Sequence, residues 1–445
     1  MFIHPTFHNE LSPTGRLLLA RLSYLPAATS LPFNERTAAA IATDPDADPQ
    51  DENTITPTDV NLLLEDLANA DALDRAGDPL HGLYTIPSDL LDLARAHDRA
   101  AAPQAVARYF DYTVASAYAA SDAITPHRGG LARTARHHPA IATFDPAGST
   151  TRAMDHLLAA LPTLDAALDL ADEHGEHQAA TNLVYAMFPV LHRHAHRERA
   201  AAVYRRGLAH AEAWGDPTAI RSMALTLGTF LRAVPGATDE AIRLTERAMD
   251  LALAAGDHRA VLHHRRSLAA CRYHAGDCEA AAQILGELLP QYDLSRPDDS
   301  RQHMLALILL GSTHSRLDNP AVAIRHLTKA LHLHQGPLEM DPLNHGRARL
   351  YLGEAHGMNG DHAGAMTELA RAQPLFVDAG APLWSAHTFE YQSNAAAHAG
   401  RKDAALDFLQ RAGAAYERLE ELAHLARLEA QLAELRATER TTTGP

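Results

Sequence analysis

Small and apolar residues recur at fixed spacings along the C-terminal half of the chain. From Gly311, Gly353 and Ser393, alanine follows after 12 positions, leucine after 16 and alanine again after 19. Ala269 is followed by an alanine after 12 positions and by a leucine after 19. Gly228 is followed by two alanines at the same spacings lengthened by one inserted residue. This pattern predicts units of two packed helices, because a small residue on the first helix lets the second helix approach closely.

These units resemble the tetratricopeptide repeat. Turn residues follow four of the small residues after seven positions, and the small residues stand 40 to 42 positions apart, compared with the usual period of about 34. We expect the excess in longer helices or longer loops between units. The predicted fold is all-α, a tetratricopeptide-like α-solenoid over residues 198–440, with a polar capping helix over 401–434 at its end.

The first hundred residues follow a different pattern. Ser12 or Thr14 starts an apolar helix over 16–25, and the acidic, proline-containing stretch 44–53 predicts a surface loop. A second helix is predicted over 60–73. Its apolar side is expected to carry Leu62, Leu63, Leu67 and Ala70.

A hairpin or wing is predicted after this second helix. Residues 74–84 contain glycine and proline at turn spacing, and Ser88 and Asp89 cap the next helix, over 90–99. Helices followed by a wing predict a winged-helix-like module over residues 1–100. Residues 101–197 are then a helical connector to the solenoid.

Several segments resemble the C-terminal part of actinobacterial signal-transduction NTPases of the NB-ARC/STAND type. That family combines an NB-ARC ATPase, a winged helix and a tetratricopeptide array. The segments that carry the resemblance are 64–74, 83–86, 89–94, 108–112, 124–126, 153–160 and 164–167. The resemblance implies a regulator, and it extends over nearly the whole chain.

The chain departs from that family at the nucleotide site. No G-x-x-x-x-G-K-[ST] motif occurs, and the two lysines, Lys329 and Lys402, do not follow a glycine-rich loop. The histidine of the family's Met-His-Asp motif is missing near Ile86–Asp89. The chain therefore resembles such a regulator without its ATPase domain, and we expect no nucleotide partner.

Charge argues against nucleic acid. The formal net charge is −16, and residues 1–100 contribute −10, with six arginines, no lysine and sixteen Asp or Glu. A duplex DNA binder needs a cationic face, so the charge argues against DNA as a partner of the predicted winged helix. No long apolar run and no signal-peptide pattern occurs, which predicts a soluble cytoplasmic protein without a membrane partner.

The usual motifs of enzymes and metal sites are missing. The chain has no G-x-S-x-G, H-E-x-x-H or C-x-x-C sequence, and Cys271 and Cys278 are interpreted as packed thiols. His192 and His196 could share a helix face, and 174–177 has the letters of a metal site in a loop. Neither group has further ligands at zinc-site spacing, so we predict no metal, no cofactor and no enzymatic activity.

Candidate ligand-binding residues come from the resemblance to tetratricopeptide arrays, in which the first helix of each repeat lines a concave groove. This implies a cationic inner wall made by Arg232, His263, Arg266, Tyr273, His274, Arg316 and Arg347. The wall would continue through Glu354, His387, Glu390, Asn394 and His398. Arginines there could clamp an acidic peptide through bidentate hydrogen bonds.

The leading hypothesis is a non-enzymatic adaptor or regulatory scaffold that binds a protein or peptide in the groove, where the arginines favour an acidic partner. One alternative is a transcription regulator whose solenoid senses a signal and whose winged helix binds DNA. A second alternative is an enzyme with its site in the groove.

Overall fold

The computed structural model contains two compact units, Met1–Phe188 and Pro189–Pro445. The first unit includes all of the predicted module 1–100 and most of the connector, so the boundaries at 100 and 197 stay predictions. The residues that the structure describes are 10–26, 30–43, 54–76, 82–126, 128, 131, 141–144, 150–194, 197–333, 342–419, 421, 424–429 and 432. The predicted loop 44–53 lies outside them.

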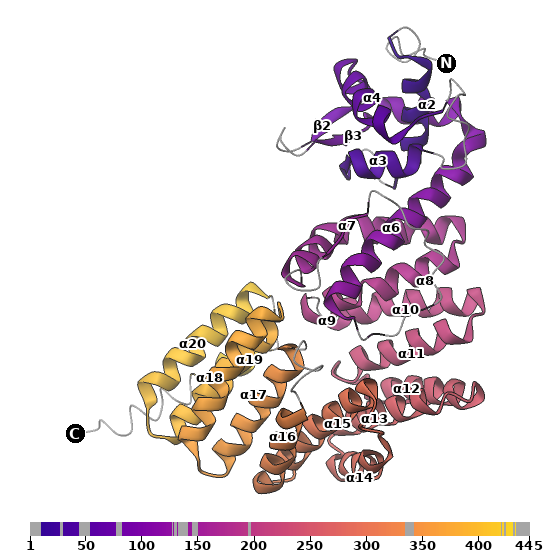
Figure 1. Ribbon diagram of the computed structural model, residues 1–445. Coiled ribbons are helices and arrows are strands. Elements are labelled where there is room, and N and C mark those ends of the chain that lie inside the picture. Colours follow the sequence, from indigo (N-terminus) through magenta and orange to yellow (C-terminus); the bar gives the residue numbers. More distant parts are fainter. Residues whose placement is uncertain are drawn as a thin grey trace. The chain divides into compact units, whose positions relative to one another are not determined.

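The first unit begins with helices and a small antiparallel sheet (Figure 1). The elements are α2 (Pro13–Leu22), β1 (Phe33–Asn34), α3 (Glu35–Ala42), α4 (Pro57–Asn69), β2 (Asp74–Ala76), β3 (Leu83–Thr85) and α5 (Ser88–His97). The central strand β3 pairs with β1 and β2, so that Tyr84 lies opposite Phe33 and Arg75. The predicted hairpin is thus confirmed, whereas the assignment as a winged helix stays a prediction.

Local details of this region correct the sequence analysis. Ser12 caps α2 by accepting a 3.0 Å hydrogen bond from the Gly15 amide. The predicted apolar side of α4 is right at Leu67, which is buried, but wrong at Leu62, which is 71% exposed while Val60 and Leu64 are buried. Spacings of four and three residues place Val60, Leu64 and Leu67 on one helical face, which leaves Leu62 on the other. The helix α3 was not predicted.

The first unit continues with long helices. They are α6 (Ala102–Ile124), α7 (Thr150–His174) and α8 (His177–Ala186), with the short 3-10 helix η2 (Arg99–Ala101) before α6. The boundary between the units falls at the start of α9 (Phe188–His194). The buried Tyr118 hydroxyl donates to the Asn182 side chain over 2.8 Å, which ties α6 to α8. Gly175, with φ of +67°, makes the predicted loop between α7 and α8.

The second unit is a series of antiparallel helix pairs, each packed on the next (Figure 1). Its helices are α10 (Arg197–Trp214), α11 (Pro217–Leu231), α12 (Thr238–Ala254), α13 (His258–His274), α14 (Cys278–Leu288), η3 (Leu289–Gln291), α15 (Pro297–Arg316), α16 (Pro320–Leu333), α17 (Pro342–Met358), α18 (His362–Asp378), α19 (Pro382–His398) and α20 (Lys402–Arg418). This is the predicted tetratricopeptide-like solenoid.

The small residues of the repeat pattern lie where two helices meet. A Cβ atom at Gly353 would stand 2.7 Å from Leu369 Cγ, and one at Gly311 would clash with the Leu327 side chain. Ser393 donates to the Ala405 carbonyl over 2.8 Å. Because real Cβ contacts are longer than 3.0 Å, the observed helix separation requires glycine at 311 and 353, whereas the small serine is accommodated at 393. The packing role predicted for the repeat is confirmed.

Long helices account for the unusual repeat length. Each of α12, α13, α17, α18, α19 and α20 has 17 residues. Short turns join them, and Gly276, Gly360 and Gly400 adopt φ of +86°, +81° and +73° there. The predicted single capping helix over 401–434 is wrong: α20 ends at Arg418, and a separate helical segment, 424–429, packs through Leu428 on Tyr416.

Candidate ligand-binding surface

The first helices of the repeats form a continuous row. Each of α11, α13, α15, α17 and α19 contacts the next in this order, while α12, α14, α16, α18 and α20 pack beside their own first helix. Side chains on the row therefore come from different repeats and meet although they are distant in sequence.

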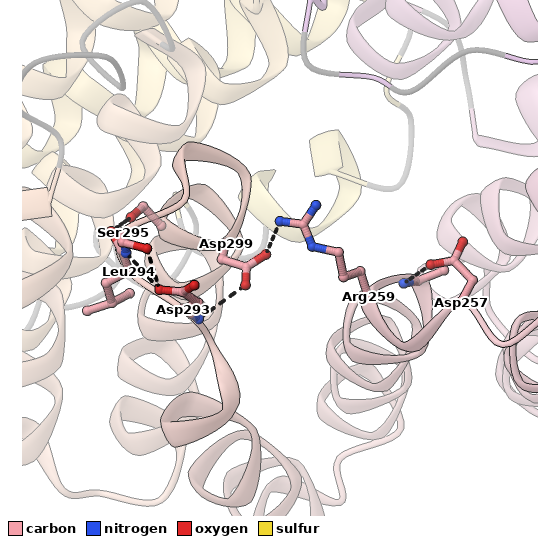
Figure 2. A network of polar contacts seen from close by, with 8 residues as sticks. Asp257, Arg259, Asp293, Leu294, Ser295 and Asp299 are labelled. Atoms are coloured by element: carbon pink, nitrogen blue, oxygen red, sulfur yellow. Dashed lines mark hydrogen bonds and ion pairs between the residues drawn. The ribbon is translucent and has the colours of Figure 1, made fainter.

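Ion pairs between repeats hold the beginnings of the first helices in register. Asp257 accepts the Ala260 amide at the start of α13 and pairs with Arg221 of α11 over 2.9 Å. The buried Asp299 of α15 pairs with Arg259 of α13 over 3.0 Å and also accepts the Asp293 amide over 3.1 Å (Figure 2). These contacts fix neighbouring first helices relative to each other, and with them the side chains farther along the row.

Six arginines, which we call the arginine cluster, lie close enough for their charges to interact with one another or with the same neighbours. They are Arg197 of α10, Arg232 at the end of α11, Arg266 of α13, Arg301 and Arg316 of α15, and Arg347 of α17. Burial lowers the pKa of Arg266 to about 10, and the positive charges of Arg232, Arg301 and Arg347 contribute. Burial also lowers the pKa of Arg232, with Arg347 and Arg197 adding to the effect.

The hydrogen-bond acceptors of three cluster members are neutral groups. Arg266 donates to the Gln302 amide oxygen over 3.1 Å, and Arg347 donates to the Asn344 amide oxygen over 2.9 Å. Arg316 donates to the Tyr273 carbonyl and lies 3.8 Å above the Tyr273 ring. Within the described part of the chain, none of these three forms an ion pair with a carboxylate. These neutral acceptors do not cancel the positive charges of the three arginines.

Tyrosines and one carboxyl group border the cluster. The Tyr273 hydroxyl lies 2.7 Å from the Ser312 hydroxyl and is buried. Burial raises the pKa of Glu354 on α17 to about 7, although a hydrogen bond from Tyr391 and the charge of Arg316 act in the opposite direction. Tyr273, Tyr351 and Tyr391 lie close enough to one another and to Glu354 for ionisation of one group to affect the pKa of Tyr273 and Tyr391. The surface thus joins a cationic region to an aromatic one.

The structure places the residues expected on the inner wall in two groups. Arg232, Arg266, Tyr273, His274, Arg316, Arg347 and Glu354 come together around the cluster. Surrounding protein atoms, and then Arg232, Arg316, Arg197 and Arg347, lower the pKa of His274 to about 3, although part of its ring reaches solvent. That histidine is neutral at physiological pH.

The remaining expected residues make other contacts. His263 stacks on His264, and His398 stacks on His362 of α18. Glu390 forms a 2.7 Å ion pair with Arg427 of the C-terminal helical segment. The ring of His387 lies 5.0 Å from that of His424 in the same segment, and Asn394 is exposed.

Sequence analysis missed Arg197, Arg301, Tyr351 and Tyr391. Helical spacing could have found Tyr351, which lies one turn after Arg347 on the same face of α17. Arg197 lies on α10, one residue before the predicted start of the repeats, and Arg193 nearby donates to the Ala379 carbonyl. This contact joins the first and last parts of the second unit, and a helix-by-helix pattern does not reveal it.

The remaining predictions from the sequence concern the two cysteines, metal binding and membrane-spanning helices. Cys271 and Cys278 are free and buried. The residues that the structure describes contain no group of three or more histidine, cysteine or carboxylate side chains able to hold a metal ion, and His196 lies outside them. Among the described helices, none has the length and apolar character needed to span a bilayer.

No family model and no curated protein matches the chain. A STAND protein with a tetratricopeptide repeat sensor from Pyrococcus horikoshii is similar in structure, with a TM-score of 0.44 and 12% identity over 97% of this chain. This chain spans 63% of the length of that protein. A Rap protein complexed with competence and sporulation factor gives 0.43 and 10%, with 96% of this chain and 99% of that one covered. The apo quorum sensor NprR from B. thuringiensis gives 0.40 and 12%, with 63% and 85% covered. Because these TM-scores are below 0.5, the similarities carry no argument about function.

Proposed function

We propose that this chain is a non-enzymatic regulatory scaffold that binds an acidic peptide segment of a protein partner at the arginine cluster. One observation carries the proposal: arginines from consecutive first helices lie together with neutral hydrogen-bond acceptors. Like charges held in proximity repel each other, and an anionic ligand would relieve that repulsion. We also propose that this binding requires no nucleotide, cofactor or metal, and that the protein is cytoplasmic.

An extended peptide suits the arrangement of the cluster. Packed helices lie about 8–10 Å apart, and an extended chain advances about 3.3 Å per residue, so that about three residues span the distance between neighbouring first helices. A segment of six residues therefore has the length to cross from α13 over α15 to α17, the helices that carry Arg266, Arg316 and Arg347. Carboxylates paired with arginine form strong, charge-assisted hydrogen bonds.

A fluorescein-labelled hexaglutamate peptide tests this proposal, with a hexalysine peptide of the same length as control. We expect fluorescence anisotropy to show saturable binding of hexaglutamate that weakens steeply between 50 and 300 mM NaCl, because added salt screens exposed charges. Hexalysine should not bind. Equal affinity for both peptides, or binding that salt does not change, would contradict the proposal.

A DNA-binding regulator is the second candidate, and the hairpin beside α4 is the observation that favours it. The exposed positions of α4, the helix that precedes the hairpin, oppose it. They are Pro57, Thr58, Asp59, Asn61, Leu62, Glu65, Asp66 and Asn69. Three are carboxylates and none is basic, so this helix would repel phosphate. A gel shift with the full chain and genomic fragments at 50 mM salt decides: retention that survives loss of the arginine cluster would assign DNA to the N-terminal module.

A further inference from the structure

The C-terminal helical segment, 424–429, packs on an apolar surface of the last helix pair, which we call the α19–α20 surface. Leu428 of the segment is buried, and Leu425 and the nearby Leu432 pack on the same cluster of side chains. The surface itself is made by Leu383, Ala386, Phe389, Leu409, Ala412, Ala415 and Tyr416. Spacings of three and four residues place the three leucines on one helical face. Amphipathic helices dock on apolar partner surfaces through this spacing.

A buried carboxylate accompanies these apolar contacts. The side chain of Glu390 on α19 is only 9% exposed, and one guanidinium nitrogen of Arg427 donates to both of its oxygens, over 2.7 and 2.9 Å. Removing the cationic partner of a buried carboxylate is strongly destabilising, because the charge then stays desolvated and uncompensated. A helix that covers this surface must therefore bring a positive charge to Glu390 as well as an apolar face.

The segment that covers the surface is a short helix of its own. The helix α20 ends at Arg418, and the segment follows it separately. The ring of His424 stacks on the ring of Tyr416, with centroids 4.8 Å apart, and adds to the contacts of the leucines and Arg427. Isolated helices shorter than about 12 residues are marginal in water, so the segment depends on these contacts for its structure. Its local release costs less free energy than global unfolding, and release uncovers the surface.

We propose that the α19–α20 surface is a second docking site, which binds an amphipathic helix of a protein partner that carries an arginine between two leucines spaced three residues apart. The chain's own C-terminal segment occupies this site until such a helix displaces it. The partner chemistry is opposite to that of the arginine cluster, because here the protein supplies the carboxylate and the partner supplies the arginine. The two sites are therefore tested independently of each other.

A fluorescein-labelled peptide of residues 421–433 is the probe, added to the full chain with Leu428→Asp. That substitution places a charge in the apolar contact and releases the tethered segment. We expect fluorescence anisotropy to show saturable binding of the probe to this variant. The wild type should bind the probe at least ~10-fold more weakly, because its own segment competes at an effective concentration in the millimolar range. Ala426→Asp, at an exposed position of the segment, is the matched control and should behave like the wild type.

An exchange of charges tests the contact with Glu390. Adding Glu390→Arg to the Leu428→Asp chain should abolish binding of the probe, and a probe with Arg427→Glu should restore it. Circular dichroism checks the fold, and Arg427→Glu in the full chain releases the segment by charge repulsion if Leu428→Asp unfolds.

Three results would overturn the proposal. The first is absence of probe binding, or equal binding to the wild type and to Leu428→Asp. The second is a failure of the exchanged charges to restore binding. The third is a concentration-dependent dimer of the wild type that Arg427→Glu abolishes, which would assign the site to a second copy of the chain.

Discussion

Gly311 and Arg316 lie five residues apart on α15, yet they belong to faces with different chemistry. Gly311 is buried against Leu327 of α16, where even a single added carbon would clash. Arg316 is exposed on the row of first helices, stacked on Tyr273 of the preceding repeat. Every first helix has such a packing face toward its own second helix, and four of them contribute arginines to the cluster.

We therefore expect the packing face to determine the stability of the fold and the arginine cluster to determine ligand binding. The packing face is small, apolar and dry, so its side chains contribute by excluding space and water. The arginine cluster is partly solvated and brings like charges together, which does not favour folding. Substitutions on the first face should therefore change the free energy of unfolding, whereas substitutions in the cluster should change binding.

The largest effect is expected in the cluster. Arg266→Glu together with Arg316→Glu should weaken hexaglutamate binding at least ~100-fold, because each charge-assisted hydrogen bond contributes about 1.5–3 kcal/mol. Helical circular dichroism and the melting temperature should stay near those of the wild type. Arg243→Glu with Arg325→Glu changes the net charge equally on the exposed faces of α12 and α16, and it should leave the affinity unchanged. Equal loss in both double variants would remove the distinction between the faces.

The packing face should show the next largest effect. Gly311→Leu forces a side chain into Leu327 and should lower the free energy of unfolding by about 1–3 kcal/mol. Urea denaturation measures the change. Gly286→Leu on α14 is the matched control, because a side chain there meets open space and should stabilise the helix by about 0.5–1 kcal/mol. A neutral Gly311→Leu would mean that the two helices are not in close contact.

A smaller effect is expected at the ends of the first helices. Asp257→Ala removes the cap of α13 and the ion pair with Arg221, at a cost of about 1 kcal/mol at pH 7. The Ala260 amide, and then Arg221, lower the pKa of Asp257 below 3.8, so this stability is present above that pH and is lost as the pH falls through the lowered value. Wild type and variant should therefore converge at acidic pH, with Asp250→Ala on α12 showing little effect throughout. A difference that persisted in acid would exclude a charge-based role for Asp257.

The sequence pattern predicts the structure correctly where the structure depends on local spacing. The small residues at 228, 269, 311, 353 and 393 were identified because close helix packing permits few side chains at those positions. The buried side of α4 was predicted correctly at Leu67 but wrongly at Leu62, because leucines occupy 62, 63 and 64 and periodicity alone could not choose among them. The cluster was found in part, through repeat positions. Arg197 and Tyr391 were missed because their proximity to it depends on how distant repeats meet.

The central claim is that an acidic segment lies along the first helices of consecutive repeats. Photo-crosslinking tests it most directly, with a hexaglutamate peptide that carries a benzophenone group and with mass spectrometry to locate the modified residues. The account predicts crosslinks on α13, α15 and α17, lost when Arg266 and Arg316 are replaced by glutamate. Crosslinks on α12, α14 or α16, or on the N-terminal module, would contradict it.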